Sequence, residues 1–311
     1  MQELWDCNAL LGNRQALDEA WERDGFWFFR NVLDKQAVAR LRARYDAILD
    51  DYHAVEPGES EPVWSGTDVS NFPFRMEALA DEQAWRLLLK APAVEEFFAS
   101  LLGARPFWIP IVVYRANPPR PEQSENRMDF IHQDGFYNQG IPFRICWIPL
   151  AKIDEPVGGL AIAPGMHRSG FFHDLQQPPK FPVPVDAISP DKWARADYEP
   201  GDLLIFDLGT PHTGLANHSD RFRLSMDIRV MPESKDVPAI GAIVDVDSAS
   251  ITVRDENGQE RQFMIDSDTY CRDRMGNRFD PSEIRTHMQV ADEVIVAGER
   301  TAASVIRPLS Y

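Results

Sequence analysis

The sequence is poor in cysteine, in basic residues and in long apolar runs, and each shortage excludes a class of protein. Its three cysteines among 311 residues are scattered and form no C-x-x-C pair, so there is no disulfide framework and a reducing compartment suits the chain. There are 32 Lys and Arg against 49 Asp and Glu, a formal net charge of −17, which disfavours general binding to nucleic acid or anionic lipid. No stretch approaches the roughly 18 apolar residues of a membrane helix, and the first residues lack the features of a signal peptide. We therefore expect a cytoplasmic protein with no nucleic-acid or membrane partner.

The first hundred residues have a helical pattern. Residues 15–23 are amphipathic, residues 26–30 form an aromatic strand candidate, and Asp34 is placed to cap a helix over residues 35–50. A further helical stretch covers residues 82–102, and Pro92 divides it into two helices.

From Pro106 onward the pattern changes to short apolar runs between turn residues. The runs cover residues 107–114, 143–150, 159–163, 202–208 and 221–230. Short strands with such turns are typical of a jelly roll. We therefore expect residues 1–232 to form a mainly β domain, a double-stranded β-helix (jelly-roll, cupin-like) core with flanking α-helices.

A second β-rich region follows the Pro-containing stretch 232–238. Asn257-Gly258 separates two alternating segments, which is a strong hairpin signal, and more strands are expected near residues 241–246, 293–297 and 302–306. We expect residues 238–311 to form a small β-barrel-like module. Homodimerisation and capping of the active-site mouth are both open as its role.

The sharpest chemical signal is His132-Gln133-Asp134. On an extended strand, residues i and i+2 point to one face, so the imidazole and the carboxylate can converge on one ion. Two imidazoles and one carboxylate make the facial triad of non-haem Fe(II) oxygenases, which keeps positions open for a bidentate co-substrate and O₂. The pair alone is a weak signal, because His and Asp occur two apart by chance in many chains.

A third ligand must come from a distant strand. The remaining histidines are His53, His167, His173, His212, His218 and His287. His212 is the best candidate, because it follows the apolar run 203–208 and the turn Gly209-Thr210-Pro211. The others have the contexts of surface or pocket-rim residues.

Eleven residues after His212, Arg223 lies on an alternating strand. Arg221, Arg223, Ser225, Asp227 and Arg229 share one face of it. A guanidinium forks onto a carboxylate, so Arg223 with Ser225 beside it is suited to the distal carboxylate of 2-oxoglutarate. For Arg221 and Arg229 we expect a solvent-facing position.

Taken together, these blocks resemble the phytanoyl-CoA dioxygenase family of 2-oxoglutarate oxygenases, over roughly residues 20–232. The matching blocks are Asp24-Gly25-Phe26, His132-Gln133-Asp134, Ile145-Cys146-Trp147, the stretch 158–168, the stretch 200–206, His212 and Arg223. The resemblance implies that His132, Asp134 and His212 bind iron, that Arg223 anchors 2-oxoglutarate, and that Trp147 borders the co-substrate. Tyr114 is expected beside the co-substrate as well.

The implied reaction uses Fe(II), 2-oxoglutarate and O₂ and releases succinate and CO₂. Because Asp134 is retained, halogenation is disfavoured, whereas hydroxylation, desaturation, epoxidation and rearrangement stay open. A cupin-type metalloenzyme without 2-oxoglutarate and a non-catalytic binding protein of the same fold are the alternatives.

We expect the substrate to be a small metabolite or natural product with an apolar body. The residues expected near it are Tyr114, Arg115, Arg127, Met128, Gln133, Phe136, Tyr137 and Arg144.

Overall fold

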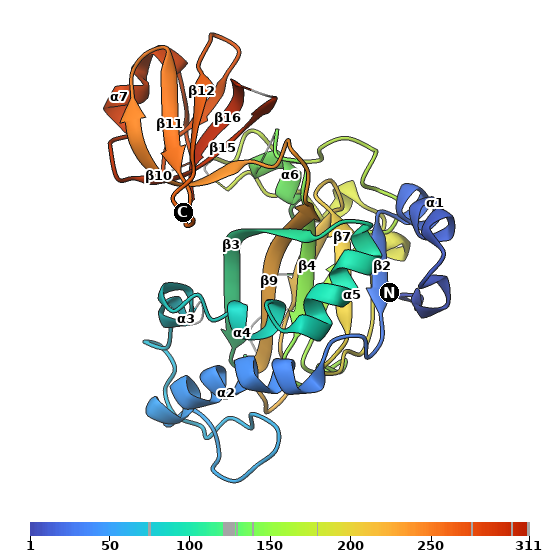
Figure 1. Ribbon diagram of the computed structural model, residues 1–311. Helices are drawn as coiled ribbons and strands as arrows, with labels where there is room; N and C mark the ends of the chain where they lie inside the picture. Colours follow the sequence, from blue (N-terminus) through green and yellow to red (C-terminus); the bar gives the residue numbers. More distant parts are fainter. Residues whose placement is uncertain are drawn as a thin grey trace. The chain divides into compact units, whose positions relative to one another are not determined.

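The computed structural model of the chain describes residues 1–73, 76–120, 128, 130–138, 140–178, 180–274, 276–299 and 301–309 (Figure 1). The chain folds into two compact units. The first comprises Met1–Pro106, Val112–Phe136 and Arg144–Val230, and the second comprises Phe107–Ile111, Tyr137–Phe143 and Met231–Tyr311. The second unit thus takes in two segments from the middle of the chain. The domain boundary between residues 232 and 238 stays a prediction.

The helices of the first unit begin and end where local side chains cap them. Helix α1 (Arg14–Asp24) begins after Asn13, whose side chain accepts the N–H of Ala16, and ends at Gly25, which has the left-handed φ of 72°. Helix α2 (Lys35–Asp51) begins after Asp34, whose carboxylate accepts the N–H of Ala37 at 2.6 Å. The remaining helices are α3 (Glu77–Asp81), α4 (Arg86–Leu89) and α5 (Pro92–Leu102). Short 3₁₀ turns cover Asn8–Leu10, Val185–Ala187 and Pro190–Lys192.

A five-stranded sheet forms the centre of the first unit. Its strands, in spatial order, are β2 (Phe26–Phe29), β7 (Leu203–Asp207), β4 (Arg144–Pro149), β9 (Arg223–Pro232) and β3 (Pro106–Asn117). Helix α5 lies across one face of this sheet, α2 runs along its lower end and α1 lies beside the edge strand β2 (Figure 1). There, Trp27 donates to the Leu17 carbonyl at 2.8 Å, and the Tyr45 hydroxyl donates to the Ser225 carbonyl at 2.9 Å.

The opposite face of the large sheet packs against a four-stranded sheet. The strands of this second sheet, in order, are β1 (Gln2–Glu3), β6 (Ala194–Arg195), β5 (Gly159–Ile162) and β8 (His212–Leu215). Tyr198 links the two layers: its ring lies 4.7 Å from that of Trp147 and 5.6 Å from that of Phe28, and its hydroxyl donates to the Leu160 carbonyl. Two packed sheets with helices outside one of them confirm the predicted mainly β jelly-roll fold.

The second unit is built around a seven-stranded sheet. In order, its strands are β12 (Glu260–Met264), β11 (Ser250–Arg254), β10 (Ala239–Val246), β15 (Glu293–Glu299), β16 (Ala302–Pro308), β13 (Tyr270–Arg272) and β14 (Arg278–Phe279). A 3₁₀ turn, Pro281–Glu283, leads into α7 (Ile284–His287). Strand β12 also pairs with β16, at Met264 and Ala302. Arg307 donates to the Asn138 side chain and Arg272 to the Tyr137 carbonyl, so these buried arginines fix the middle segment that belongs to this unit.

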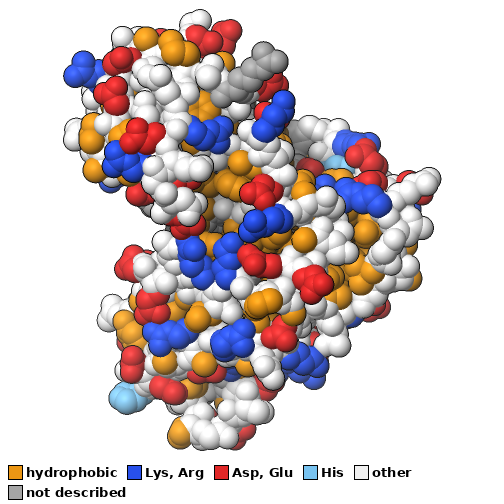
Figure 2. All heavy atoms as spheres, viewed as in Figure 1, with side chains coloured by type: hydrophobic (Ala, Val, Ile, Leu, Met, Phe, Trp, Pro, Cys, Tyr) orange, Lys and Arg blue, Asp and Glu red, His pale blue; other side chains and the backbone are white. Residues whose placement is uncertain are grey.

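The predicted β-hairpin around Asn257-Gly258 is confirmed, with β11 and β12 in antiparallel register from Ser250–Met264 to Arg254–Glu260. On the face shown in Figure 2, acidic and basic side chains are interspersed, so the net negative charge does not gather there into one patch. Among the described residues, no helix has the length and apolar character that a membrane span requires.

Candidate metal centre and co-substrate pocket

The two proposed histidine ligands are joined by their backbones. His132 and His212 form an antiparallel bridge, in which the N–H of His132 donates to the His212 carbonyl at 3.1 Å and the reverse bond measures 2.9 Å. Their ring centroids lie 4.1 Å apart. The fold therefore brings the two imidazoles together before any ion binds.

Backbone carbonyls also orient the two rings. Nδ1 of His132 lies 3.1 Å from the Phe130 carbonyl, and Nδ1 of His212 lies 3.1 Å from the Thr210 carbonyl. A hydrogen bond to a carbonyl requires the proton to be on Nδ1, so the lone pair of each neutral ring is on Nε2, which is the arrangement common among metal-binding histidines.

Asp134 completes the group at the first residue of α6 (Asp134–Tyr137). Its Oδ1 lies 3.4 Å from Nε2 of His132 and 3.8 Å from Nε2 of His212, and the three potential ligand atoms all lie within 4.8 Å of one another. The expected extended strand through Asp134 is wrong, because the chain turns into a helix there. Gly135 permits this turn: its N–H donates to the Leu208 carbonyl at 2.7 Å, and a side chain would collide with Leu208.

The electrostatics of the site keep its groups in metal-binding form. Burial and the neighbouring His132 lower the pKa of His212 to about 3, so its ring is neutral near pH 7. Burial alone would raise the pKa of Asp134, but the Arg229 guanidinium and the two imidazoles outweigh it, and the pKa lies well below its ordinary value. Two imidazoles and an ionised carboxylate on one side of a buried site fit Fe(II).

Arg229 is a residue that the sequence interpretation misplaced. It is only 7% exposed, and its guanidinium donates to Oδ2 of Asp134 at 2.8 Å and to Oδ1 of Asp227 at 2.6 Å. The predicted solvent-facing position is therefore wrong for Arg229. It is also wrong in part for Arg221, which is half-buried and forms an ion pair with Asp154 at 2.7 Å. Both faces of β9 are covered, one by helices and the other by the small sheet.

Arg223, Ser225 and Trp147 lie on the inner face of the large sheet, as Asp227 does. Residue pairing between β4 and β9 places Trp147 opposite Asp227, and cross-strand partners share a face. The buried Arg223 guanidinium donates to the carbonyls of Gly159 and Leu215 on the small sheet. Ser225 Oγ is buried and has no hydrogen-bond partner among the described residues. A buried guanidinium beside a hydroxyl without a partner fits a bound carboxylate.

The structure does not bring Tyr114 to this pocket. Tyr114 is on the helix-facing side of β3, where its hydroxyl accepts the Trp85 N–H at 2.9 Å and its ring packs against Tyr45. Arg144 also points to the helix side, with its guanidinium over the rings of Trp21 and Trp27. The expectations that Tyr114 borders the co-substrate and that Arg144 lies near the substrate are therefore corrected.

Gln133 is also corrected, from a substrate residue to a structural one. Its side chain is fully buried and donates to the carbonyls of Gly170 at 2.9 Å and Gly209 at 2.7 Å, while it accepts the Phe172 N–H at 2.9 Å. Its backbone N–H donates to Nε2 of His173. Gln133 thus joins the segment that carries two ligands to the loop before residue 174 and to the turn before His212.

Replacing Gln133 with leucine is expected to lower the free energy of unfolding by about 2–4 kcal/mol, because it leaves the buried Gly209 carbonyl unpaired and removes the bonds to Gly170 and Phe172. Urea denaturation of the metal-free protein measures this. Gln177→Leu is the matched control, since Gln177 is exposed and its side chain bonds to Asp174 in the same loop, and we expect a change within about 0.5 kcal/mol. Equal stability of the two variants would contradict the structural role.

The other predicted substrate residues have different surroundings, and only some of them lie close to the triad. Phe136 is half-buried and stacks on His173 at 4.0 Å, and Arg115, whose side chain is 41% exposed, lies with Nε 3.5 Å from Oδ2 of Asp227. Met128 forms a backbone bridge with Leu215, the last residue of β8, and packs on the small-sheet core. Tyr137 ends α6 and belongs to the second unit. Arg127 lies outside the described residues.

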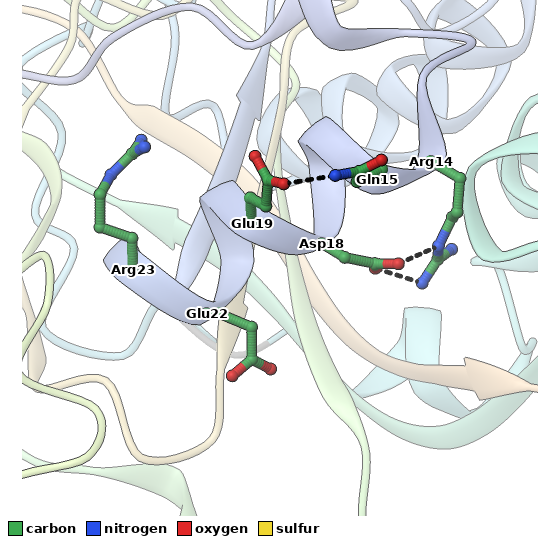
Figure 3. A pocket seen from close by; sticks show the side chains of 6 residues that line it. All are labelled: Arg14, Gln15, Asp18, Glu19, Glu22 and Arg23. Carbon is green, nitrogen blue, oxygen red and sulfur yellow. Dashed lines mark hydrogen bonds and ion pairs between the residues drawn. The ribbon is translucent and has the colours of Figure 1, made fainter.

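A separate hollow of about 770 Å³ lies along α1 and is unrelated to the triad. Figure 3 shows its lining side chains, which all come from this one helix and include the pairs Arg14–Asp18 and Gln15–Glu19. These are i, i+4 pairs on an exposed helix face, so the hollow has the character of ordinary helix surface.

Comparison with known proteins identifies the fold and its site. Residues 21–225, about two thirds of the chain, match the sequence profile of the family described as Phytanoyl-CoA dioxygenase (PhyH). The chain belongs to the phytanoyl-CoA dioxygenase family. The predicted resemblance is confirmed, and with it the reaction class, an oxygenase dependent on non-haem iron and 2-oxoglutarate, to which the His132–Asp134–His212 group is fitted.

This family member is similar to two curated hydroxylases. It is 29% identical, over 74% of its length and 85% of the relative's, to 1-deoxypentalenic acid 11-beta-hydroxylase of Streptomyces arenae. It is 28% identical, with the same coverage, to the protein of the same name from Streptomyces exfoliatus.

Solved structures show the same fold. One is EvdO2 from Micromonospora carbonacea var. aurantiaca, with a TM-score of 0.50 and 19% identity over 76% of this chain and 97% of that one. Another is the non-heme monooxygenase ThoJ without ligand, with a TM-score of 0.50 and 21% identity over 70% of this chain and 77% of that one.

Proposed function

We propose that this protein hydroxylates a small, mainly apolar carboxylic acid, with iron held by His132, Asp134 and His212 and 2-oxoglutarate held by Arg223 and Ser225. The observation that carries the site assignment is the convergence of three ligand atoms within 4.8 Å on the inner side of the jelly roll. When bound, Fe(II) with 2-oxoglutarate supplies the oxidising power for inserting one atom of O₂ into a C–H bond, with succinate and CO₂ as co-products.

The chain's own residues bind, orient and exclude water. Arg223 and Ser225 would hold the distal carboxylate of 2-oxoglutarate, with Trp147 on the same face of the sheet. The Phe206 ring lies 4.8 Å from that of His212 and is buried, so this side of the metal centre is apolar and closed to solvent. Exclusion of water favours reaction with substrate over uncoupled decay of the oxidant.

Two features support an apolar acid as substrate. The aromatic residues Phe130 and Phe136 are half-buried close to the ligands, with Phe130 stacked on His132 at 4.9 Å. Arg115 presents a partly exposed guanidinium on the same charged network as Asp134, and can meet an acidic group. The relatives are named as hydroxylases of an acid, 1-deoxypentalenic acid, which is in line with both features.

Reconstitution with Fe(II), 2-oxoglutarate and O₂ tests this function. A panel of small apolar carboxylic acids, including 1-deoxypentalenic acid, and their methyl esters would be screened for products carrying one added oxygen atom, and succinate would be measured in parallel. We expect succinate and hydroxylated product in equal amounts with an acid, and slower turnover with its ester. Absence of succinate with every small molecule, or faster turnover of the esters, would contradict the proposal.

Homodimerisation through the second unit, the absence of nucleic-acid and membrane partners, and a cytoplasmic location stay predictions.

A further inference from the structure

Four charged side chains of the first unit form a continuous chain that starts at a metal-binding carboxylate. Oδ2 of Asp134 accepts from Arg229 at 2.8 Å, Arg229 donates to Oδ1 of Asp227 at 2.6 Å, and Oδ2 of Asp227 lies 3.5 Å from Nε of Arg115. The first three side chains are at most 10% exposed, whereas Arg115 is 41% exposed. Acids and bases alternate along it, so each buried carboxylate faces a guanidinium.

The two oxygens of Asp134 face different partners. Oδ1 is the oxygen near both imidazoles, at 3.4 Å from His132 and 3.8 Å from His212. Oδ2 is held by Arg229. A guanidinium hydrogen bond to a carboxylate is strong and directional, more so in a buried site. One oxygen therefore faces the two imidazoles, where the metal would bind, and the other is held by Arg229.

That division matters because the reaction needs open coordination positions. A facial triad occupies three of six positions, and a bidentate 2-oxo acid and O₂ need the remaining three. If Asp134 bound through both oxygens, it would take one of them. We propose that Arg229 is a positioning residue that restricts Asp134 to one metal-binding oxygen and so keeps the 2-oxoglutarate position open. This inference rests on the proposed function.

Asp227 holds the Arg229 guanidinium in the orientation in which it binds Asp134. Arg229 presents different nitrogens to the two acids, Nη2 to Asp134 and Nη1 to Asp227. The planar fork spans both carboxylates at once, which a single ammonium group cannot do with the same geometry. Lysine at this position is therefore expected to be only a partial substitute, although it keeps the charge.

The experiment compares Arg229→Met and Arg229→Lys with the matched control Arg221→Met, which removes an arginine–aspartate pair just before the same strand, away from the triad. Each protein is loaded anaerobically with saturating Fe(II) and titrated with 2-oxoglutarate, and the weak visible charge-transfer band of the chelate is recorded. We expect the apparent Kd for 2-oxoglutarate to rise by ~10–100-fold in Arg229→Met, as large as the loss of metal affinity or activity when a side chain that holds a metal ligand is removed, and by less in Arg229→Lys. Arg221→Met should match the wild type.

Infrared spectroscopy measures how Asp134 binds the metal, which the loss of a positive charge alone would not change. With ¹³C-labelled aspartate, the difference between metal-loaded and metal-free protein shows the separation of the two carboxylate stretches, which narrows when a carboxylate binds through both oxygens. We expect narrowing in both Arg229 variants and none in Arg221→Met.

The outcomes separate this inference from the proposed function. If wild-type protein develops no chelate band, the proposed function fails. If wild type develops the band and folded Arg229→Met binds 2-oxoglutarate equally well with an unchanged infrared separation, the inference is overturned. If Arg229→Met fails to fold, the result with Arg229→Lys decides. A wild-type Kd for 2-oxoglutarate and a wild-type separation of the carboxylate stretches would overturn the proposal. Weaker 2-oxoglutarate binding with a narrower separation of the stretches would support it.

Discussion

Replacing His212 with alanine is expected to remove iron binding and to lower the rate of succinate formation by more than ~100-fold, since loss of a direct ligand exceeds the 10–100-fold typical of outer-shell changes. His212 supplies one of three ligand atoms, and the remaining pair, His132 and Asp134, cannot hold the ion in facial geometry. Iron content after gel filtration and succinate release measure the two effects.

His218→Ala is the control for this variant, because His218 is exposed and lies on the same segment six residues later. It should retain iron and turnover. The variants should unfold at similar denaturant concentrations when metal-free, since the backbone bridge at position 212 does not need the imidazole. Full iron occupancy in His212→Ala would refute the ligand assignment.

Replacing Arg223 with leucine is expected to weaken 2-oxoglutarate binding by ~30-fold to several thousand-fold, equivalent to about 2–5 kcal/mol for one partner of a buried charge pair. The KM for 2-oxoglutarate should rise while iron binding stays intact, because Arg223 bonds to carbonyls of the small sheet and is not among the ligands. Steady-state kinetics at varied 2-oxoglutarate measure the KM, and a separate iron titration measures iron binding.

Ser225→Ala should also raise the KM for 2-oxoglutarate, by a smaller amount, because the Ser225 hydroxyl has no hydrogen-bond partner among the described residues and would be available to the co-substrate. Arg221→Leu serves as the control just before the same strand and should leave the KM for 2-oxoglutarate unchanged. A normal KM in Arg223→Leu would exclude Arg223 as the anchor and would direct attention to Arg115 or Arg229.

Alternation along β9 predicted correctly which residues share a face, but it could not say which faces are covered. Arg223, Ser225, Asp227 and Arg229 do lie together on the inner side. Arg229 was expected to face solvent, and instead β4 and β3 flank the strand while other layers cover both of its faces. Four polar residues at alternate positions in an otherwise apolar strand were a signal of an internal charge network.

The spacing of His132 and Asp134, with the context of His212, located the candidate ligands but not their surroundings. The separation of His132 and Asp134 was sufficient for convergence, although the chain turns into a helix at Asp134 rather than continuing as a strand. The role of Gln133 depends on the return of a loop some forty residues later, and the direction of Tyr114 depends on which face of β3 the helices cover. Neither is encoded in the residues beside them.

The backbone bridge between His132 and His212 also bears on how the protein acquires its metal. Two ligands that are distant in sequence are brought together when the sheet forms, so the loss of chain entropy from closing that long loop occurs during folding and does not weaken metal binding. Metal capture then needs little rearrangement, and the apoprotein is preorganised. After a chelator removes the iron, new iron should bind without refolding, at a rate set by encounter and ligand exchange. Protein deprived of iron should therefore stay folded and able to bind iron again.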